Sequence, residues 1–482
     1  MNVRMIFFML GRGLFVEAFL MCAPLFVSIY FREPTDTIYA WVLPILLILA
    51  IAFLLSRRGP NQHRFFAREG FVICALLWLN LSFFGALPLY FSRSYPTLMD
   101  AFFEIASGFT TTGASVAQNV EALPHSVLFW RSFSHLIGGM GVLVFTLALV
   151  PKTAADSVHM MRAEVPGPVF GKIVSKLTIT ARILYAIYFS MTGIVILLLL
   201  LGGMPLFDSF CHAFGAAGTG GFGIKNNSIA FYDSTYLHNV LSFSMIAFGI
   251  NFNLYYLLLL KRVRDFWKDE ELHWYIGIIL TAVVLLSWNV APQYNNLGTL
   301  VRDVFFTVSS VMTTTGYATV DFAQWPLFSH IILLLLMFIG GCAGSTGGGI
   351  KVSRIAIYVK SSFRELKRQR EPNRALPLRF NQQSVSTELL HGLHSYLMAY
   401  ILIFIFLLFV TSFDAPDFES AFSAVAATFN NIGPGLGVYG PAGNFASLSP
   451  LTKFFLSLGM IAGRLEIWPM LILFSPMTWQ KN

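Results

Sequence analysis

The segment Asp303–Gly316, DVFFTVSSVMTTTG, contains a pattern that recurs along the chain. It begins with an Asp suited to capping a helix, stays apolar for about two turns, and ends in hydroxyl residues and a glycine. The same spacing of thirteen residues joins a capping residue to a glycine in three other segments, and the second residue after each cap is Phe. These segments are DAFFEIASGFTTTG from Asp100 to Gly113, DSFCHAFGAAGTGG from Asp208 to Gly221, and SAFSAVAATFNNIG from Ser420 to Gly433.

Each of the four segments predicts a short helix that starts at the Asp or Ser and stops at the Thr/Gly residues. A helix of about 13 residues spans about 20 Å, which is too short to cross a hydrocarbon core of about 30 Å. We therefore expect re-entrant half-helices. The negative end of each helix dipole would then face the Thr/Gly residues, and this arrangement suits a cation.

The composition indicates a membrane protein. Of all residues, 56% are hydrophobic and 12% are charged, and Phe occurs 48 times. Soluble domains of this total length would need more charged surface than the chain supplies. The four cysteines lie far apart, so they suggest neither a disulfide framework nor a paired metal-ligand spacing. No Ser/His/Asp or paired-carboxylate pattern stands out, and we expect no enzymatic active site.

Ten apolar stretches are long enough to cross a membrane. Two of them fall within residues 1–66, and the first is expected to be a retained helix because no small-residue cleavage site follows it. The other eight flank the four short segments in the order span, half-helix, tail, span. The repeats are expected at residues 67–150, 175–262, 268–360 and 386–476, with second spans at 124–150, 236–260, 327–357 and 451–475.

The basic residues predict the orientation. The loops 56–68, 151–182, 261–268 and 351–379 hold 22 of the 32 Lys and Arg residues. By the positive-inside rule these loops are cytoplasmic, both termini lie on the same side, and the tails open outward. The net charge of +8 is thus a property of the inner face and does not indicate nucleic-acid binding. We also expect an acidic outer vestibule that concentrates cations, with residues that include Asp100, Glu104, Asp208, Asp233, Asp303, Asp321 and Glu419.

The four tails that end the half-helices are the candidate ion-binding segments. They are Thr110–Gly113, Thr219–Gly221, Thr313–Gly316 and Asn430–Gly433. Backbone carbonyls at membrane depth must line a cavity or coordinate something, and rings of carbonyls form potassium filters. A single TTTG would merely end a helix, but four copies at fixed spacing favour a filter. The candidate filter residues are Thr111, Thr112, Gly113, Gly220, Gly221, Thr314, Thr315, Gly316, Asn431, Ile432 and Gly433.

A glycine-rich segment, GGCAGSTGGGIK at residues 340–351, interrupts the second span of the third repeat. It resembles a phosphate loop only superficially, because no GK[ST] ends it and no soluble βα unit surrounds it. It predicts a break inside the membrane, below the filter of the same repeat. A packing kink in a tilted helix is the alternative, but six glycines in ten residues exceed what a kink requires.

Arg464 lies in an otherwise apolar span of the fourth repeat, with Glu466 two residues later. Ionisable groups within a span usually face a water-filled path or a partner. On sequence alone, a positive barrier in a pore and a structural pair with a carboxylate are both open.

Together these features resemble the Trk/Ktr/HKT superfamily of potassium transporters, and within it the bacterial TrkH-type membrane subunit, over essentially the whole chain. The resemblance implies an all-α polytopic membrane protein with four helix–pore-helix–helix repeats around one pseudo-fourfold pore, plus two N-terminal transmembrane helices. It implies filter glycines at Gly113, Gly221, Gly316 and Gly433, and Gly113 favours potassium because sodium-conducting members often have Ser there. It also makes residues 340–350 an intramembrane gating loop and places an Arg near it. The gate residues are then Gly344, Ser345, Thr346, Gly347, Gly348, Gly349 and Arg464.

The expected function is potassium uptake across the bacterial inner membrane through a gated, channel-like pore. The alternative is an ion-coupled secondary carrier, driven by H⁺ or Na⁺, of potassium or another small solute. Potassium is the transported ion, and no organic cofactor is expected. The resemblance implies a homodimer and a cytosolic TrkA-type nucleotide-binding regulatory subunit. The basic segment Ser361–Phe380 is a candidate contact for that subunit, with anionic membrane lipid as the alternative partner.

Overall fold

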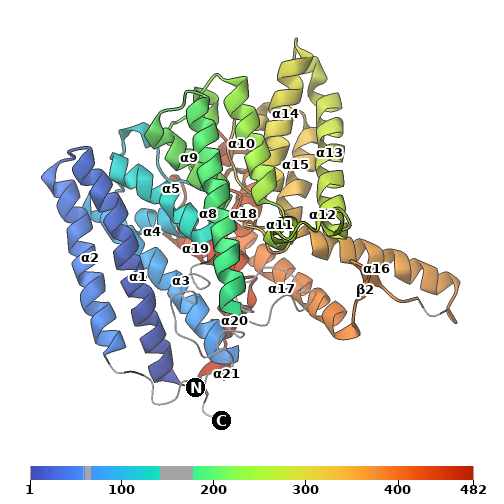
Figure 1. Ribbon diagram of the computed structural model, residues 1–482, viewed down its shortest axis with the longest axis horizontal. Helices are drawn as coiled ribbons and strands as arrows, with labels where there is room; N and C mark the ends of the chain where they lie inside the picture. Colours follow the sequence, from blue (N-terminus) through green and yellow to red (C-terminus); the bar gives the residue numbers. More distant parts are fainter. Residues whose placement is uncertain are drawn as a thin grey trace.

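The computed structural model describes residues 2–57, 59, 67–139, 141, 177–374 and 376–480. Their secondary structure is helical apart from one short antiparallel hairpin, β1 (Arg379–Phe380) and β2 (Gln383–Ser384) (Figure 1). The all-α fold expected from the sequence is confirmed. The end of the first expected repeat after Gly141, the basic loop 151–176 and most of the loop 56–68 lie outside the described residues.

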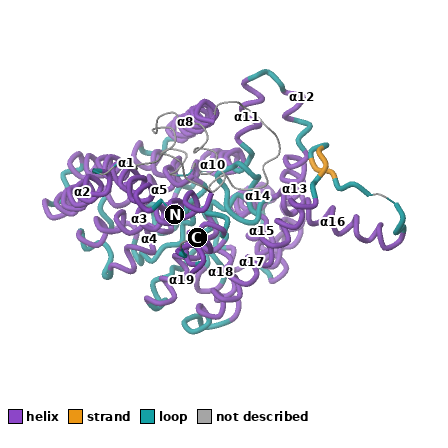
Figure 2. Tube along the Cα trace, turned by 90° about the horizontal axis from the view of Figure 1, so that it is seen from below, coloured by secondary structure: helices purple, strands orange, loops and turns teal. Residues whose placement is uncertain are grey.

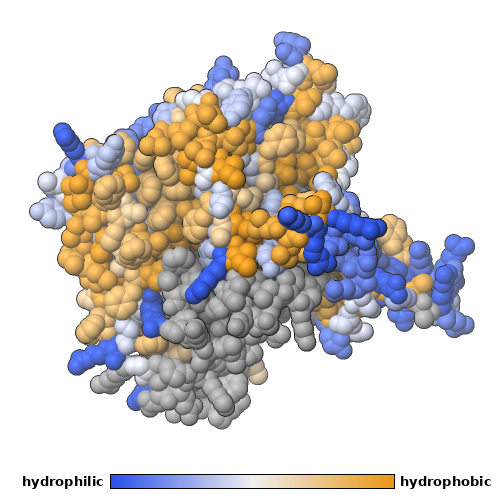
Figure 3. Space-filling model, viewed as in Figure 1, coloured by the Kyte–Doolittle hydropathy of each residue, from blue (hydrophilic) through white to orange (hydrophobic). Residues whose placement is uncertain are grey.

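Six helices of the described residues are long and apolar enough to cross a membrane, and they coincide with six of the ten expected spans. They are α1 (Val3–Tyr30), α2 (Thr35–Ser56), α3 (Ala67–Phe91), α8 (Leu177–Leu201), α13 (Glu270–Val290) and α17 (Thr387–Thr411). Figure 3 shows the resulting apolar band across the body of the molecule. Helices α1 and α2 form a hairpin at one edge (Figure 1). Phe19 and Phe26 of α1 are 73% and 67% exposed. Such a surface suits contact with lipid.

Four shorter helices end at the tails: α4 (Leu98–Phe109), α9 (Leu206–Gly218), α14 (Leu297–Met312) and α18 (Phe418–Phe429). They begin earlier than expected, so the assignment of Asp100, Asp208, Asp303 and Ser420 as caps is wrong. Thr97 caps α4 by accepting from Asp100 N, and its hydroxyl donates to the Asp100 carboxylate at 2.7 Å. Asp417 caps α18 through Ser420 N. A residue three positions earlier therefore satisfies the free N–H groups of these two helices.

Within the described residues, the second spans of the second, third and fourth repeats are broken. The break in the third repeat was expected from its glycine-rich segment, whereas the breaks in the second and fourth correct the expectation of continuous helices. The second repeat has α10 (Thr235–Phe248) and α11 (Phe252–Leu259), bent by 92°. The third has α15 (Leu327–Ile339), a loop, and α16 (Val352–Arg370), and the fourth has α19 (Pro450–Arg464) and α20 (Trp468–Phe474). Positive φ angles at Gly340 (76°) and at Glu466 and Ile467 (56° and 71°) cannot continue a right-handed helix. The first repeat has α5 (His125–Gly139), and the structure describes only Gly141 in the stretch that follows.

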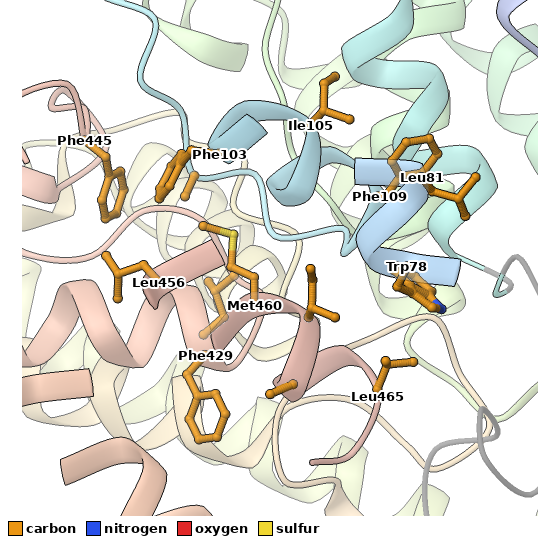
Figure 4. Close-up of a cluster of buried hydrophobic side chains, with 14 of the residues drawn as sticks. Trp78, Leu81, Phe103, Ile105, Phe109, Phe429, Phe445, Leu456, Met460 and Leu465 are labelled. Atoms are coloured by element: carbon orange, nitrogen blue, oxygen red, sulfur yellow. The ribbon is translucent and has the colours of Figure 1, made fainter. Parts of the chain in front are cut away.

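Each second helix packs against the tail-bearing helix of the next repeat. Helix α5 contacts α9, α10 contacts α14, α15 contacts α18, and α19 contacts α4. The last of these contacts joins the fourth repeat to the first and closes the arrangement. Figure 4 shows buried side chains at this contact, with Phe103 of α4 near Leu456 and Met460 of α19. The core of the protein thus surrounds the tails.

The remaining elements are short or project from the body. Helix α16 and the β1–β2 hairpin extend to the side, at the edge opposite α2 (Figures 1 and 2). The basic segment expected as a loop is therefore helical as far as Arg370. Both termini lie at the same end of the molecule (Figure 1). The other helices are η1 (Val120–Ala122), η2 (Ser228–Phe231), α12 (Val263–Phe266), η3 (Ala291–Gln293), η4 (Phe322–Gln324), η5 (Gly437–Tyr439) and α21 (Pro476–Trp479).

Candidate functional site

The same backbone hydrogen bonds end all four tail-bearing helices. The N–H of the residue before each tail glycine donates to the carbonyl five residues earlier, at 2.8 Å in every repeat. The N–H one residue before that donates to the carbonyl three residues earlier, at 3.0–3.2 Å. This is the helix ending in which one residue takes a left-handed conformation. The donors of the first set are Thr112, Gly220, Thr315 and Ile432.

The left-handed residue that ends each of the four helices is not a glycine. Thr111, Thr219, Thr314 and Asn431 have φ angles of 54°, 56°, 60° and 59°. Left-handed backbone costs an L-residue about 1–2 kcal/mol, and a β-branched side chain makes it rarer still. A glycine would end these helices without that cost. Three strained threonines therefore count against the interpretation in which TTTG merely ends a helix.

The four tail glycines, Gly113, Gly221, Gly316 and Gly433, are also left-handed, with φ between 71° and 102°. Left-handed residues therefore alternate along each tail, and this alternation lets successive carbonyls turn to the same side. The tail side chains Thr111, Thr112, Thr314 and Thr315 are fully buried. The tails are thus closed to lipid, and their carbonyls can face a central path.

The tail glycines join the four tails into a closed ring. A Cβ added to Gly113 would lie 2.0 Å from the carbonyl oxygen of Gly220, and one on Gly221 would lie 1.9 Å from that of Thr315. A Cβ on Gly316 would lie 2.0 Å from the oxygen of Ile432, and one on Gly433 would lie 2.8 Å from that of Thr112. Each glycine therefore contacts the carbonyl just before the glycine of the next repeat. The contacts run from the first tail to the second, from the second to the third, from the third to the fourth, and from the fourth back to the first.

Side chains complete the ring unevenly. The hydroxyls of Thr110 and Thr112 are 2.8 Å apart, and those of Thr313 and Thr315 are 2.7 Å apart. In the fourth tail Asn431 Nδ2 donates to Thr112 Oγ1 and to the Met460 carbonyl, both at 2.9 Å. Asn431, which stands where the first and third tails have Thr, therefore makes hydrogen bonds that those threonines do not make.

The glycine loop, Gly340–Lys351, lies directly against two of the tails. Gly348 N donates to Thr314 Oγ1 at 2.6 Å, and Gly349 N donates to the Asn430 carbonyl at 3.1 Å. The Lys351 ammonium donates to the carbonyl of Gly347 within the loop. Ser345 and Thr346 are buried, and Thr346 Oγ1 donates to the Phe248 carbonyl at 3.1 Å. The loop therefore sits beneath the third and fourth tails.

Glu271 anchors both ends of the glycine loop, and sequence reasoning missed it. Its Oε1 accepts from Ala343 N at 2.8 Å and from Ser353 N at 2.9 Å. Glu271 is 4% exposed, in the first turn of α13. In the sequence it resembles any acidic residue at a helix N-terminus, so only the tertiary contact reveals its role.

Arg464 connects three repeats. Its Nη1 donates to the Thr346 carbonyl at 2.7 Å, and its Nη2 donates to the carbonyls of Gly138 and Gly139 at 2.6 and 2.7 Å. These two glycines end α5, where a cation also meets the negative end of the helix dipole. The nearby Glu466 instead forms an ion pair with Arg354. Arg464 is 8% exposed and lies against the glycine loop.

Two of the acidic residues expected to line an outer vestibule are instead buried in ion pairs. Glu104 pairs with Arg131 at 2.8 Å, and both side chains are buried. Asp100 pairs with Lys453 at 2.6 Å, also out of solvent. These carboxylates are neutralised and hold the walls around the tails, so they cannot attract cations as free charges. The sequence did not reveal these pairs because the partners of the second lie 353 residues apart.

Comparison with known proteins decides the family. Residues 44–481 match the family described as TrkH, a cation transport protein. The chain belongs to the TrkH family. It is 37% identical to the Trk system potassium uptake protein TrkH of Salmonella typhimurium, with both chains covered completely. It is 33% identical to the Trk system potassium uptake protein TrkG of Escherichia coli K12, covering 100% of this chain and 99% of the relative.

The structure gives the same result. It matches the crystal structure of the potassium transporter TrkH from Vibrio parahaemolyticus with a TM-score of 0.89 and 31% identity, over the whole of both chains. The resemblance to TrkH-type subunits is thereby confirmed. As a member of the TrkH family, the protein is a multi-pass membrane transporter of the Trk potassium uptake type and not an enzyme.

Proposed function

We propose that this TrkH-family protein takes up potassium through a selective, gated pore whose filter is formed by the four tails. The observation that carries the proposal is the closed ring in which each tail glycine contacts the carbonyl before the next one. Four carbonyl-bearing segments held edge to edge in this way suit the replacement of an ion's hydration shell. Helix C-termini that end at the ring add negative potential.

The gate in this proposal is the glycine loop together with Arg464. The loop lies against the tails through Thr314 and Asn430, and Arg464 adds a positive charge next to it. A guanidinium close to the ion path repels cations electrostatically, and the loop blocks the path sterically. The pore opens when the loop moves away from the tails and from Arg464.

Regulation in this proposal comes from the cytosolic side. Helix α16 begins directly after the glycine loop and carries Arg364, Lys367, Arg368 and Arg370 toward its exposed end. A TrkA-type nucleotide-binding subunit that binds there could pull on α16 and shift the loop between two states. The proposal includes a homodimer in the bacterial inner membrane, with both termini cytoplasmic.

Reconstitution in liposomes tests the proposal. Potassium flux is measured at zero and at imposed membrane potential, with and without a pH gradient. A pore gives flux that follows the potassium gradient and the potential alone, and it excludes sodium. Uptake that requires a proton or sodium gradient would instead support the ion-coupled carrier.

A further inference from the structure

The second tail lacks the paired threonines of the first and third. When the tails are aligned on their glycines, Gly218 and Gly220 occupy the positions of Thr110 and Thr112. The second tail therefore has no hydroxyl pair like the one that joins those threonines at 2.8 Å. Its backbone nevertheless has the same form, with φ angles of 56° at Thr219 and 71° at Gly221. Something other than a threonine pair must hold it.

His135 of α5 fills the space that the missing side chains would occupy. The ring is fully buried, and a Cβ on Gly220 would lie 2.2 Å from its Nδ1 and 2.3 Å from its Cγ. A Cβ on Gly218 would lie 2.2 Å from the His135 carbonyl oxygen. Contact with His135 therefore explains why both positions are glycine. Its backbone carbonyl approaches Gly218, and its imidazole ring packs against Gly220.

The imidazole also bonds to two repeats at once. Its Nδ1 lies 2.9 Å from the Gly108 carbonyl oxygen in the last turn of α4, and its Nε2 accepts from Phe222 N at 3.3 Å. The ring contacts the Phe222 ring at a centroid distance of 4.4 Å. A carbonyl on one side and an N–H on the other require a neutral ring with its hydrogen on Nδ1. His135 thus links the first helix ending to the residue just after the second tail glycine.

The fourth repeat offers an internal comparison. Gly463 of α19 occupies the position that Gly138 has in α5. A Cβ on Gly463 would lie 2.0 Å from the Phe429 carbonyl oxygen, and one on Gly138 would lie 1.8 Å from that of Phe109. Each of these Phe residues stands four positions before a tail glycine. Counting back three residues places Met460 at the position of His135. The Met460 carbonyl accepts from Asn431 Nδ2, which also donates to Thr112 of the first tail, where the threonine pair is kept. The chain therefore combines Met with Thr–Thr at one interface and His with Gly–Gly at the other.

We propose that His135 positions the second tail and helps to set ion specificity there, acting in place of the threonine pair. The inference rests on the proposed function of the tails as a filter. The histidine acts through the backbone of Gly220 and Phe222, so it is a positioning residue and not an ion ligand.

Two substitutions separate the bonds of the ring from its volume. His135→Phe keeps a ring of similar size without either nitrogen, and His135→Gln keeps one donor and one acceptor. In liposomes we expect His135→Phe to lower the potassium-to-sodium permeability ratio roughly fivefold to tenfold, the range for the loss of about one buried hydrogen bond. His135→Gln should recover most of the ratio. Tyr188→Phe is the matched control, because the buried hydrogen bond that it removes goes to the backbone of Leu136, next to His135, and not to a tail, and it should keep the ratio.

A double-mutant cycle tests the contact with Gly220. Gly220→Ala should lower the ratio, because its Cβ displaces the imidazole. His135→Ala/Gly220→Ala should be no worse than His135→Ala alone, since the three atoms nearest to that Cβ all belong to the ring. Fully additive losses would show that the two residues act independently and would overturn the proposal.

Gly113→Ser distinguishes this inference from the filter proposal. If Gly113→Ser lowers the ratio and folded His135→Phe keeps it, the inference about His135 is wrong and the filter stands. If neither variant changes the ratio, the filter proposal fails and this inference fails with it. Should His135→Phe not yield folded protein, Gly220→Ala decides alone, and a parental ratio in that variant overturns the role of His135.

Discussion

Arg464 donates from Nη1 to the carbonyl oxygen of Thr346 at 2.7 Å, and this bond joins the last repeat to the glycine loop of the third. The other guanidinium nitrogen holds the end of α5 through Gly138 and Gly139. One side chain therefore ties together three segments that lie more than a hundred residues apart in the sequence. If the loop moves away from the tails, either the bond between Arg464 and Thr346 breaks or the Arg464 side chain moves with the loop.

Replacing Arg464 by Ala should raise potassium flux through the isolated subunit. The change removes charge-assisted hydrogen bonds worth about 1.5–3 kcal/mol each, so we expect an increase of at least about tenfold. Shortening Gly344–Gly349 should act in the same direction. Arg302→Ala is the control, because Arg302 pairs with Asp303 away from the loop. Unchanged or lower flux in folded Arg464→Ala would mean that the residue only packs.

Gly113→Ser should relax the selectivity for potassium over sodium. The new side chain would meet the Gly220 carbonyl, and its backbone would be strained at φ 83°. Gly193→Ser in α8 is a matched control, since outside its own helix no atom of the described residues lies within 4 Å of a Cβ there. Permeability ratios from liposome flux decide the matter, and equal ratios in both variants would remove Gly113 from the filter.

Glu271→Ala should loosen the glycine loop and raise flux. It leaves the N–H groups of Ala343 and Ser353 without their acceptor, at a cost of about 1–3 kcal/mol for each buried group. Glu271→Gln keeps Oε1 and should stay close to the parent. Thermal unfolding in detergent and flux are measured together. A loss of stability without a change in flux would restrict Glu271 to a structural role.

Asp100→Ala should destabilise the fold by about 3–5 kcal/mol, because Lys453 stays buried without its carboxylate. The double variant Asp100→Ala/Lys453→Met should regain most of that loss. The exposed pair of Arg262 and Asp265 is the control, and Asp265→Ala should cost less than about 1 kcal/mol. Equal losses at the two sites, measured by thermal unfolding, would contradict the assignment of the buried pair as structural.

Replacing Arg364, Lys367, Arg368 and Arg370 by Gln should weaken binding of the regulatory subunit and uncouple nucleotide from flux, with selectivity unchanged. These residues project along α16, which leads directly from the glycine loop. A control with the same loss of charge replaces Lys261, Arg262, Arg264 and Lys268 by Gln. Pull-down in detergent and flux are measured in parallel. A full nucleotide response in the α16 variant would exclude this route, and equal effects in both variants would indicate a general effect of charge.

The sequence correctly predicted where the four short helices end, because Thr, Asn and Gly residues at those positions stop a helix locally. Gly113 and its three counterparts must be glycine, because a carbonyl oxygen lies 1.9–2.8 Å from where a Cβ would be, so their spacing is visible in the chain. The breaks in the second spans of the second and fourth repeats were missed. In the fourth, Glu466 and Ile467 take left-handed conformations that no hydropathy pattern reveals. The ion pair of Lys453 and Asp100 was not predicted, because the two residues lie 353 positions apart in the sequence. The role of His135 depends on two glycines in another repeat, and only the folded structure places them together.

The ring of four tails belongs to one polypeptide, and this changes how it can evolve. In a channel built from four identical subunits, one codon alters all four quarters of the filter at once. Here a codon alters a single quarter, so a change at Gly220 can be offset by a change at His135 while the other three contacts stay as they were. Each quarter can therefore acquire its own chemistry in small steps.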